Sequence, residues 1–168
     1  MSNVPTNSFT GQWSLGANNQ PASNCDINSP GQYANQRCGI SQSWGSAGAA
    51  LNQQGGGVYA VNWNPESGIK MWFFPRNRIT QDIQNGNPNI WGWGKPFANF
   101  LFGGNCPSNK FIDHQIVFNI ALCSDWAGSV FPQMCPGKKN CVDFARQNFW
   151  EFNEAYWIVN YLRVYSPQ

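Results

Sequence analysis

At 168 residues with a net charge of +2, the chain has the size of one ordinary domain and lacks the basic surface of a nucleic-acid binder. Charged residues make up only 11% of it, against about 25% in an average protein, whereas aromatic residues make up 15%. Such a surface of amides, hydroxyls and flat rings suits a neutral polysaccharide, and no apolar run approaches the about 20 residues of a membrane span.

Residues 1–56 are almost entirely Asn, Gln, Ser, Gly, Ala and Pro. That composition favours loops, and two cysteines with spaced aromatic residues predict loops that are pinned onto a sheet. A short helix is favoured around residues 47–53, where β-branched residues are absent. Residues 1–10 have neither a basic start nor an apolar stretch, so they predict no signal peptide.

Residues 57–75 carry the clearest strand pattern. Residues 58–63 alternate bulky with small or polar side chains, residues 65–68 read Pro-Glu-Ser-Gly, and residues 69–74 run back. This arrangement predicts an antiparallel hairpin that ends at Pro75.

The rest of the chain predicts a long loop followed by three strands. Residues 79–93 contain turn-forming Gly, Pro and Asn, with a helical turn favoured at residues 80–83. The strands are expected at residues 98–102, 111–120 and 156–165. Both faces of the last strand carry large rings, so both are expected to be covered.

Several short strands, Gly- and Pro-rich turns and no long helix predict an all-β sandwich or jelly roll. One domain is expected over residues 1–168. Residues 1–56 would form its loop-rich, disulfide-pinned part, and residues 57–168 would supply the main strands.

Six cysteines, an even number, favour disulfides and an oxidising compartment. The sequence leaves the pairing open. We favour the local bridges Cys25–Cys38 and Cys135–Cys141, with Cys106–Cys123 tying the strand at residues 111–120 to its neighbour; buried free thiols are the alternative. With one histidine and no Cys-x-x-Cys pair, neither a metal site nor a cofactor is expected.

The most informative stretch is residues 110–128. It places the only histidine, His114, in an apolar strand pattern and follows that strand with Cys123, Asp125 and Trp126 on a tight Ala-Gly exit. Sugar-handling β-sandwiches present an aromatic platform beside polar groups in this way. The stretch resembles the one that closes the sugar cleft in the fungal laminarinase branch of glycoside hydrolase family 16.

Other phrases are similar to the same family and follow in its order. They are residues 55–60, 68–76, 93–96, 114–118, 123–128 and 153–165. Together they resemble the downstream half of a laminarinase. The resemblance implies a concanavalin-like β-jelly-roll of two antiparallel sheets, with a glucan cleft on the concave sheet, truncated or rearranged here.

This chain departs from the family at the carboxylates. The family's catalytic strand reads Glu-x-Asp-x-x-Glu and holds its nucleophile and general acid about 5 to 5.5 Å apart. The chain has no such strand; its carboxylates are Glu66, Glu151, Glu154, Asp26, Asp82, Asp113, Asp125 and Asp143. The family also more usually has Asp at the position of Asn119 and Gly at that of Ser124, and an amide cannot act as a base.

The resemblance and the composition together indicate eight candidate ligand-binding residues. They are Trp126, Asp125, His114, Trp72, Trp63, Arg76, Trp91 and Trp93. Trp126 is the first choice, on a loop leaving a strand, with packing under that loop as its alternative. His114 is the weaker choice, because a lone histidine in an apolar strand is more often a core residue.

The other candidate ligand-binding residues are chosen from their local sequence. Trp63 and Trp72 flank the hairpin turn and could stack on sugar rings, although hairpin tryptophans are more often core. Arg76 offers a fork of donors to a hydroxyl pair or a carboxylate. Trp91 and Trp93, in a Gly-rich loop, are the aromatic residues expected at the surface, as an outer subsite.

The resulting hypothesis is a secreted or cell-wall protein that binds β-1,3 or mixed-linkage glucan, as polysaccharide or oligosaccharide, without hydrolysing it. The alternative is an endo-β-1,3(4)-glucanase fragment that acts only when its missing half completes it. A structural cell-wall protein is the second alternative.

Association is also expected, because a jelly roll without its upstream strands would expose strand edges and apolar faces. A homodimer that covers these faces is the first expectation. The alternative is that residues 1–56 fold back and replace what is missing.

Overall fold

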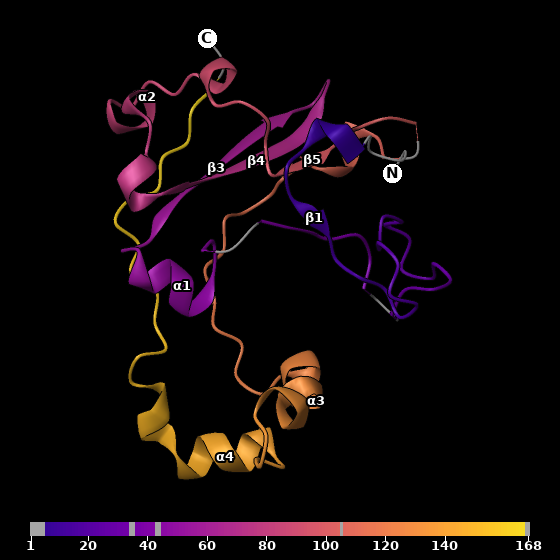
Figure 1. Cartoon of the computed structure of the whole chain (residues 1–168), viewed down its shortest axis with the longest axis vertical. Helices are drawn as coiled ribbons and strands as arrows, with labels where there is room; N and C mark the ends of the chain where they lie inside the picture. The colour runs from indigo at the N-terminus through magenta and orange to yellow at the C-terminus, as the bar shows by residue number, and fades with distance from the viewer. Residues whose placement is uncertain (1–5, 34–35, 43–44, 105, 167–168) are drawn as a thin grey trace. The chain divides into compact units, whose positions relative to one another are not determined.

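The computed structural model describes residues 6–33, 36–42, 45–104 and 106–166, without the side chains of Thr6 and Trp126. The chain forms two compact units, Met1–Asp113 and His114–Gln168. Figure 1 traces the chain from indigo at its start to yellow at its end. One domain over residues 1–168 stays a prediction.

A three-stranded antiparallel sheet, in the order β3-β4-β5, forms the centre of the first unit (Figure 1). Strand β3 spans Gly57–Asn64, β4 spans Gly68–Pro75 and β5 spans Ala98–Phe100. Strands β3 and β4 pair along their whole length. The predicted hairpin and the strand predicted from residue 98 are therefore confirmed.

Two residues fix the turn between β3 and β4. The side-chain oxygen of Asn64 accepts the backbone N–H groups of Glu66, at 2.8 Å, and Ser67, at 3.2 Å. Gly68 has a φ of 118°, and a Cβ atom there would overlap the carbonyl oxygen of Phe100. Position 68 therefore requires glycine, for its backbone conformation and for the space it leaves to β5.

The sheet has two different faces, because residues opposite each other in antiparallel strands point the same way. The Trp63 face consists of Tyr59, Val61 and Trp63 with their partners Phe73, Met71 and Ile69. The Trp72 face consists of Val58, Ala60 and Asn62 with their partners Phe74, Trp72 and Lys70. The β3 residues of the Trp63 face are exposed, whereas Trp72 is buried.

The N-terminal segment lies along the residues that lead into β5. The N–H groups of Thr10 and Gly11 donate to the carbonyl oxygens of Pro96, at 2.9 Å, and Phe97, at 3.0 Å. Strands β1 (Gln12–Trp13) and β2 (Ile40–Ser41) pair with each other, and the Cys25–Cys38 disulfide closes the loop between them. The predicted Cys25–Cys38 pairing is confirmed.

Short helices and a small core complete the first unit. Helices α1 (Gly48–Gln53) and α2 (Gln81–Gln84) confirm the helical turns predicted at residues 47–53 and 80–83. The buried apolar side chains of the described residues are Phe9, Ala22, Trp72, Ile83, Phe97 and Ala98. All six belong to the first unit.

The second unit contains helices α3 (Asp125–Met134) and α4 (Cys141–Gln147) and a 3-10 helix at Phe149–Phe152. The ring of Phe144 contacts those of Phe131 and Phe152, with centroids 5.6 and 6.3 Å apart. The Asn140 side chain caps α4 by accepting the N–H of Asp143 at 3.0 Å. Neither helix was predicted from the sequence.

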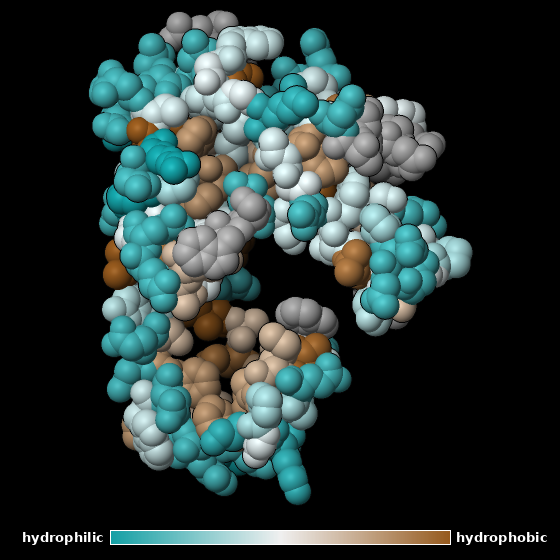
Figure 2. Space-filling model, viewed as in Figure 1, coloured by the Kyte–Doolittle hydropathy of each residue, from teal (hydrophilic) through white to brown (hydrophobic). Residues whose placement is uncertain are grey.

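Two predicted strands are wrong. In the described part of the chain, residues 111–120 and 156–165 pair into no sheet. Their sequences favour strands, but a strand forms only on the backbone of a neighbour. The rings and aliphatic side chains that were expected to be covered are instead exposed, and Figure 2 shows apolar side chains at the surface of the unit that holds α3 and α4.

Two predicted disulfides, Cys106–Cys123 and Cys135–Cys141, are also wrong. Cys123 pairs with Cys141, and Cys106 and Cys135 are free thiols. The prediction assumed that a paired strand would carry Cys123 to a neighbouring strand. Instead, Cys123 precedes α3 and Cys141 begins α4, and the two helices pack together.

Candidate functional site

Trp72 belongs to the core. Its side chain is only 6% exposed, and its indole N–H donates to the carbonyl oxygen of Gly94 at 3.1 Å. The ring of Trp93 lies edge-on to both Trp72 and Phe74, with centroids 5.3 Å from each. Trp93 therefore covers the Trp72 face, and Trp72 supports the site from beneath.

Asp82 holds the loop that carries Trp93. Its Oδ2 atom accepts the backbone N–H of Asn89 and the indole N–H of Trp93, both at 2.7 Å. Burial raises the pKa of Asp82, but these hydrogen bonds outweigh burial and lower the pKa to about 2. The carboxylate is thus charged throughout the neutral and mildly acidic range.

Trp91 is presented to solvent on the loop between those two anchors. It lies on a 3-10 turn, Ile90–Gly92, that the Asn89 side chain caps: the backbone N–H of Trp91 donates to Asn89 Oδ1 at 3.2 Å. The Trp91 side chain is 90% exposed. We call residues 89–94 the Trp91 loop; Asp82 holds it through the backbone N–H of Asn89 and through the side chain of Trp93, and between these two contacts the loop offers a flat indole.

Trp63 lies on the other side of the sheet from Trp72. Trp63 is opposite Ile69 and Trp72 is opposite Ala60, so the two indoles fall on opposite faces. Trp63 is 50% exposed. The structure therefore does not bring Trp63 into one site with Trp72 and Trp93.

Arg76 follows β4 directly and is tied to the end of α1. Its Nε donates to the carbonyl oxygen of Gly55 at 2.9 Å, and its backbone N–H donates to Gly56 at 3.0 Å. Both glycines have positive φ, of 76° and 86°. The Arg76 side chain is exposed at the surface, and its Nε is held by the backbone of Gly55.

The last three nominees belong to the second unit. His114 is exposed and lies on no strand, so the alternative of a core histidine is wrong. Asp125 lies in the first turn of α3, where its charge favours the helix. Trp126 is in α3 and not on a loop, and its side chain lies outside the described residues.

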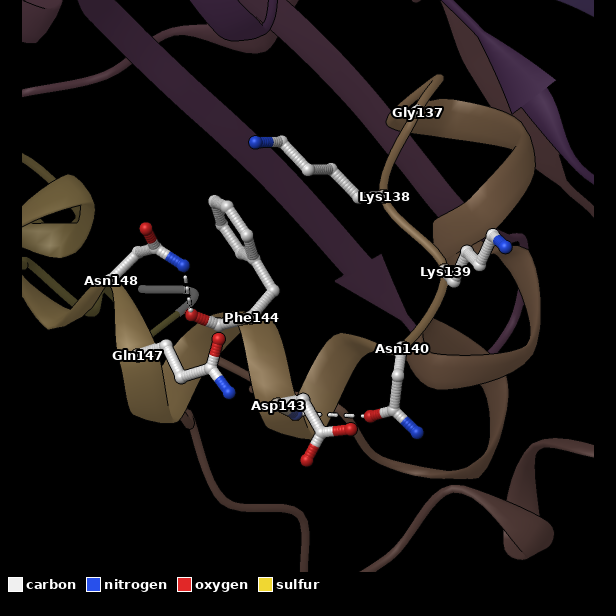
Figure 3. A pocket seen from close by; sticks show the side chains of 8 residues that line it. All are labelled: Gly137, Lys138, Lys139, Asn140, Asp143, Phe144, Gln147 and Asn148. Carbon is white, nitrogen blue, oxygen red and sulfur yellow. Dashed lines mark hydrogen bonds between the residues drawn. The ribbon is translucent and has the colours of Figure 1, made fainter.

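A shallow polar pocket of about 390 Å³ lies on the second unit and holds none of the nominated residues. Figure 3 shows its lining, from the loop before α4 and from α4 itself. The Lys138 ammonium lies 4.8 Å from the centre of the Phe144 ring, and Asn148 donates to the carbonyl oxygen of Phe144 at 2.9 Å. A narrower, apolar cavity of about 300 Å³ in the first unit is lined by Phe100, Phe102, Phe111, the Cys25–Cys38 disulfide and the Cys106 thiol, among others.

No group of three or more His, Cys, Asp or Glu side chains in the described part of the chain is close enough to hold a metal ion. None of the helices described is long and apolar enough to cross a membrane.

The residues that position the Trp91 loop were not predicted from the sequence. Asp82 was considered only as a carboxylate without a partner, and Asn89 was not considered. The role of Asn89 could be predicted, because an Asn two residues before Trp91 is typical of a turn in which the Asn side chain accepts a backbone N–H. No local sequence pattern predicts the hydrogen bond between Asp82 and Trp93.

Comparison with known proteins identifies close relatives. Residues 2–165 match the family model described as the XgeA-like catalytic GH16 domain. The chain is 40% identical over 149 residues to an endo-1,3(4)-beta-glucanase of Arthroderma benhamiae, covering 85% of this chain and 32% of that protein. It is 41% identical over 147 residues to a probable glycosidase of Schizosaccharomyces pombe, covering 85% and 34%. The chain thus spans about a third of the length of these curated relatives.

Comparison with solved structures shows that the fold is similar as well as the sequence. An elongating GH family 16 beta-1,3-glucosyltransferase matches with 34% identity and a TM-score of 0.67, over 92% of this chain and 50% of that one. A mutant laminarinase 16A that cyclizes laminariheptaose matches with 31% identity and a TM-score of 0.55, over 81% and 48%. The predicted all-β fold class, a jelly-roll sandwich of antiparallel sheets, is confirmed.

Proposed function

The chain belongs to glycoside hydrolase family 16, among the XgeA-like catalytic domains, and from that premise we propose that it is the β-glucan-contacting part of an endo-1,3(4)-β-glucanase domain. The resemblance seen in the sequence is thereby confirmed. As an isolated chain it would bind β-glucan without cleaving it, and hydrolysis would require a carboxylate pair from outside these 168 residues.

The exposed indole of Trp91 carries the proposal. A sugar ring offers apolar C–H faces that stack on a flat aromatic side chain, and the Trp91 ring is open on a loop that Asp82 fixes in advance. A preformed platform binds with a smaller entropic cost than a mobile one. Trp93, held edge-on over Trp72, is half-buried beside it and extends the aromatic surface.

The carboxylates of the chain support binding over turnover. A retaining glycosidase needs a nucleophile and a general acid about 5 to 5.5 Å apart. No two carboxylates of this chain are five residues apart, as the two glutamates of Glu-x-Asp-x-x-Glu are, and Asp82 is held by its hydrogen bonds to the Trp91 loop. Its lowered pKa also makes Asp82 unsuited to serve as a general acid.

The disulfides support a secreted or cell-wall location. Cys25–Cys38 and Cys123–Cys141 would persist in an oxidising compartment, and β-glucan of a cell wall would be met there.

The test is affinity electrophoresis through gels that contain laminarin, run beside an assay of reducing-end release. We expect retardation of the chain and no release of reducing ends. Trp91→Ala should lose about 2 kcal/mol of binding free energy, the order of burying one large apolar side chain, whereas Phe149→Ala, an exposed ring outside the nominated site, should migrate like the parent.

Two results would contradict the proposal. Equal migration of the chain through gels with and without glucan would favour the structural cell-wall protein. Sustained release of reducing ends by the chain alone would favour a rearranged carboxylate pair. Trp126→Ala, in the same gels, tests the first residue nominated from the sequence.

A further inference from the structure

Three of the six cysteines lie on the wall of one cavity in the first unit. This apolar cavity of about 300 Å³ is lined by both cysteines of the Cys25–Cys38 disulfide and by Cys106, whose thiol is free. A free thiol is the nucleophile of thiol–disulfide exchange, and a disulfide is the bond that it attacks. The cavity therefore holds both reactants of an exchange reaction within one unit of the chain.

The backbone of Cys106 is fixed, but its side chain has room to turn. Its N–H donates to the carbonyl oxygen of Gly103 at 2.9 Å, and its carbonyl oxygen accepts the N–H of Gly103 at 3.0 Å. The Cys106 side chain is half-buried, so its thiol is accessible, as a reactive thiol must be. The empty cavity beside it allows the side-chain rotation that brings one sulfur to another, which a close-packed interior would prevent.

Gln32 holds the two ends of the disulfide loop together independently of the disulfide. Its Oε1 atom accepts the N–H of Asn24 at 3.1 Å, and its Nε2 atom donates to the carbonyl oxygens of Asn24, at 2.8 Å, and Arg37, at 3.0 Å. Asn24 and Arg37 directly precede Cys25 and Cys38. Opening the disulfide would therefore leave both of its sulfur atoms beside the cavity, where the reaction can also run backwards.

We propose that Cys106 and the Cys25–Cys38 disulfide form a site of reversible thiol–disulfide exchange. The Cys106 thiol loses its proton to solvent, and its thiolate attacks one sulfur of the disulfide. Attack on Cys38 forms a Cys38–Cys106 bridge and releases the Cys25 thiolate, which takes up a proton; attack on Cys25 forms a Cys25–Cys106 bridge and releases Cys38 in the same way. The numbers of bridges and thiols stay the same, so the exchange requires no oxidant or reductant.

The exchange changes which segments of the first unit are joined. Cys25–Cys38 closes a local loop between β1 and β2. A bridge to Cys106 would instead tie that loop to the segment that follows β5, and it would close a much longer loop of chain. The exchanged form is thus a second covalent state of the unit, in which the N-terminal part is bonded to the region of the central sheet.

The test is disulfide mapping of the full 168-residue chain by mass spectrometry. A chain kept at about pH 4 is divided, one part is brought to about pH 8.5 without added thiol or oxidant, and both are then alkylated in acid and digested. We expect bridges to Cys106 in about a tenth or more of the molecules at the higher pH alone, with an equal amount of newly alkylated Cys25 or Cys38. Absence of these bridges at the higher pH would overturn the proposal.

Two matched variants identify the attacking thiol. Cys106→Ser should abolish the new thiols at Cys25 and Cys38. Cys135→Ser removes the free thiol of the second unit, which does not line this cavity, and should leave the exchange unchanged. New thiols in the Cys106→Ser chain would contradict the proposal. Bridges to Cys135 as frequent as those to Cys106 would indicate general scrambling and contradict it equally.

Dilution separates exchange within one chain from exchange between chains. Because an intramolecular reaction does not depend on protein concentration, an about tenfold dilution should leave the share of bridges to Cys106 unchanged, and these bridges should occur in the monomer band of a non-reducing gel. Bridges confined to a dimer band, or a share that falls on dilution, would overturn the proposal. The readout involves no glucan, so either result leaves the proposed function to its own test.

Discussion

The two units of the chain show what a strand sequence can and cannot do alone. In the first unit β3, β4 and β5 find one another within 44 residues, and all the buried apolar side chains of the described residues gather there. The sequences at residues 111–120, which run from the first unit into the second, and at residues 156–165 are as apolar, but in the part of the chain that the structure describes neither pairs into a sheet. A disulfide and three rings hold the helices of the second unit instead. Pairing with a neighbouring strand therefore decides whether a segment becomes a strand more than the β-propensity of its residues does.

The largest expected effect is at the hairpin of the first unit. Gly68→Ala forces a Cβ atom into the carbonyl oxygen of Phe100 and a non-glycine residue to a φ of 118°, so it should lower the free energy of unfolding by more than about 4 kcal/mol. Gly92→Ala is the matched control, since a Cβ atom there meets nothing within 4 Å. Urea unfolding followed by circular dichroism measures both; similar midpoints would show that β5 does not close on the hairpin.

The next effect compares one tryptophan from each unit. Trp72 and Trp157 both donate their indole N–H to a backbone carbonyl, but Trp72 is 6% exposed and Trp157 is 60% exposed. Trp72→Ala should therefore cost about 3 to 4 kcal/mol by leaving a cavity, and Trp157→Ala less than about 1 kcal/mol. Thermal unfolding of the two variants checks this. Equal losses would mean that the second unit has a core of its own.

Removing the Cys123–Cys141 disulfide should affect the second unit alone. The double change Cys123→Ser and Cys141→Ser opens a loop with a separation of 18 residues, which should cost about 3 kcal/mol. Hydrogen–deuterium exchange should then speed up in α3 and α4 and stay unchanged in β3 and β4. Faster exchange in both regions would show that the units unfold together.

Acid should have the smallest effect, and a local one. Because hydrogen bonds lower the pKa of Asp82 from 3.8 to about 2, its charged form stabilises the fold fully above the ordinary value, and this contribution is lost as the pH falls from about 4 through about 2. The indole N–H resonance of Trp93, followed by NMR, should shift with a midpoint near 2. A midpoint at the ordinary value would contradict the hydrogen bonds of Asp82.

The parts of the fold that the sequence predicted correctly are local. The hairpin at residues 57–75 has its strands and its turn within one short stretch, and Cys25–Cys38 closes a loop with a separation of 13 residues. The strand predicted at residues 111–120 is wrong, because no strand among the described residues pairs with it. The predicted bridges Cys106–Cys123 and Cys135–Cys141 are wrong, because two helices that were not predicted bring Cys123 and Cys141 together.

The sequence predicted the aromatic residues of the candidate site but not the residues that position them. A Gly-rich loop indicated that Trp91 would be exposed, and it is. Trp93 is half-buried, because its ring covers Trp72 and Phe74 and its N–H is held by Asp82. That contact depends on how the loop packs on the sheet, which no short sequence pattern encodes.

The outer edge of β3 has a consequence for handling the protein. Strand β3 is the first of the sheet order β3-β4-β5, so among the described residues one of its edges has no strand beside it, and Gly57–Asn64 contains neither a charged residue nor a proline. Its exposed side chains on the Trp63 face are Tyr59, Val61 and Trp63. Such an edge makes concentrated solutions prone to fibrillar aggregation. Val61→Lys would place a charge on this edge and oppose its pairing with the edge of another molecule.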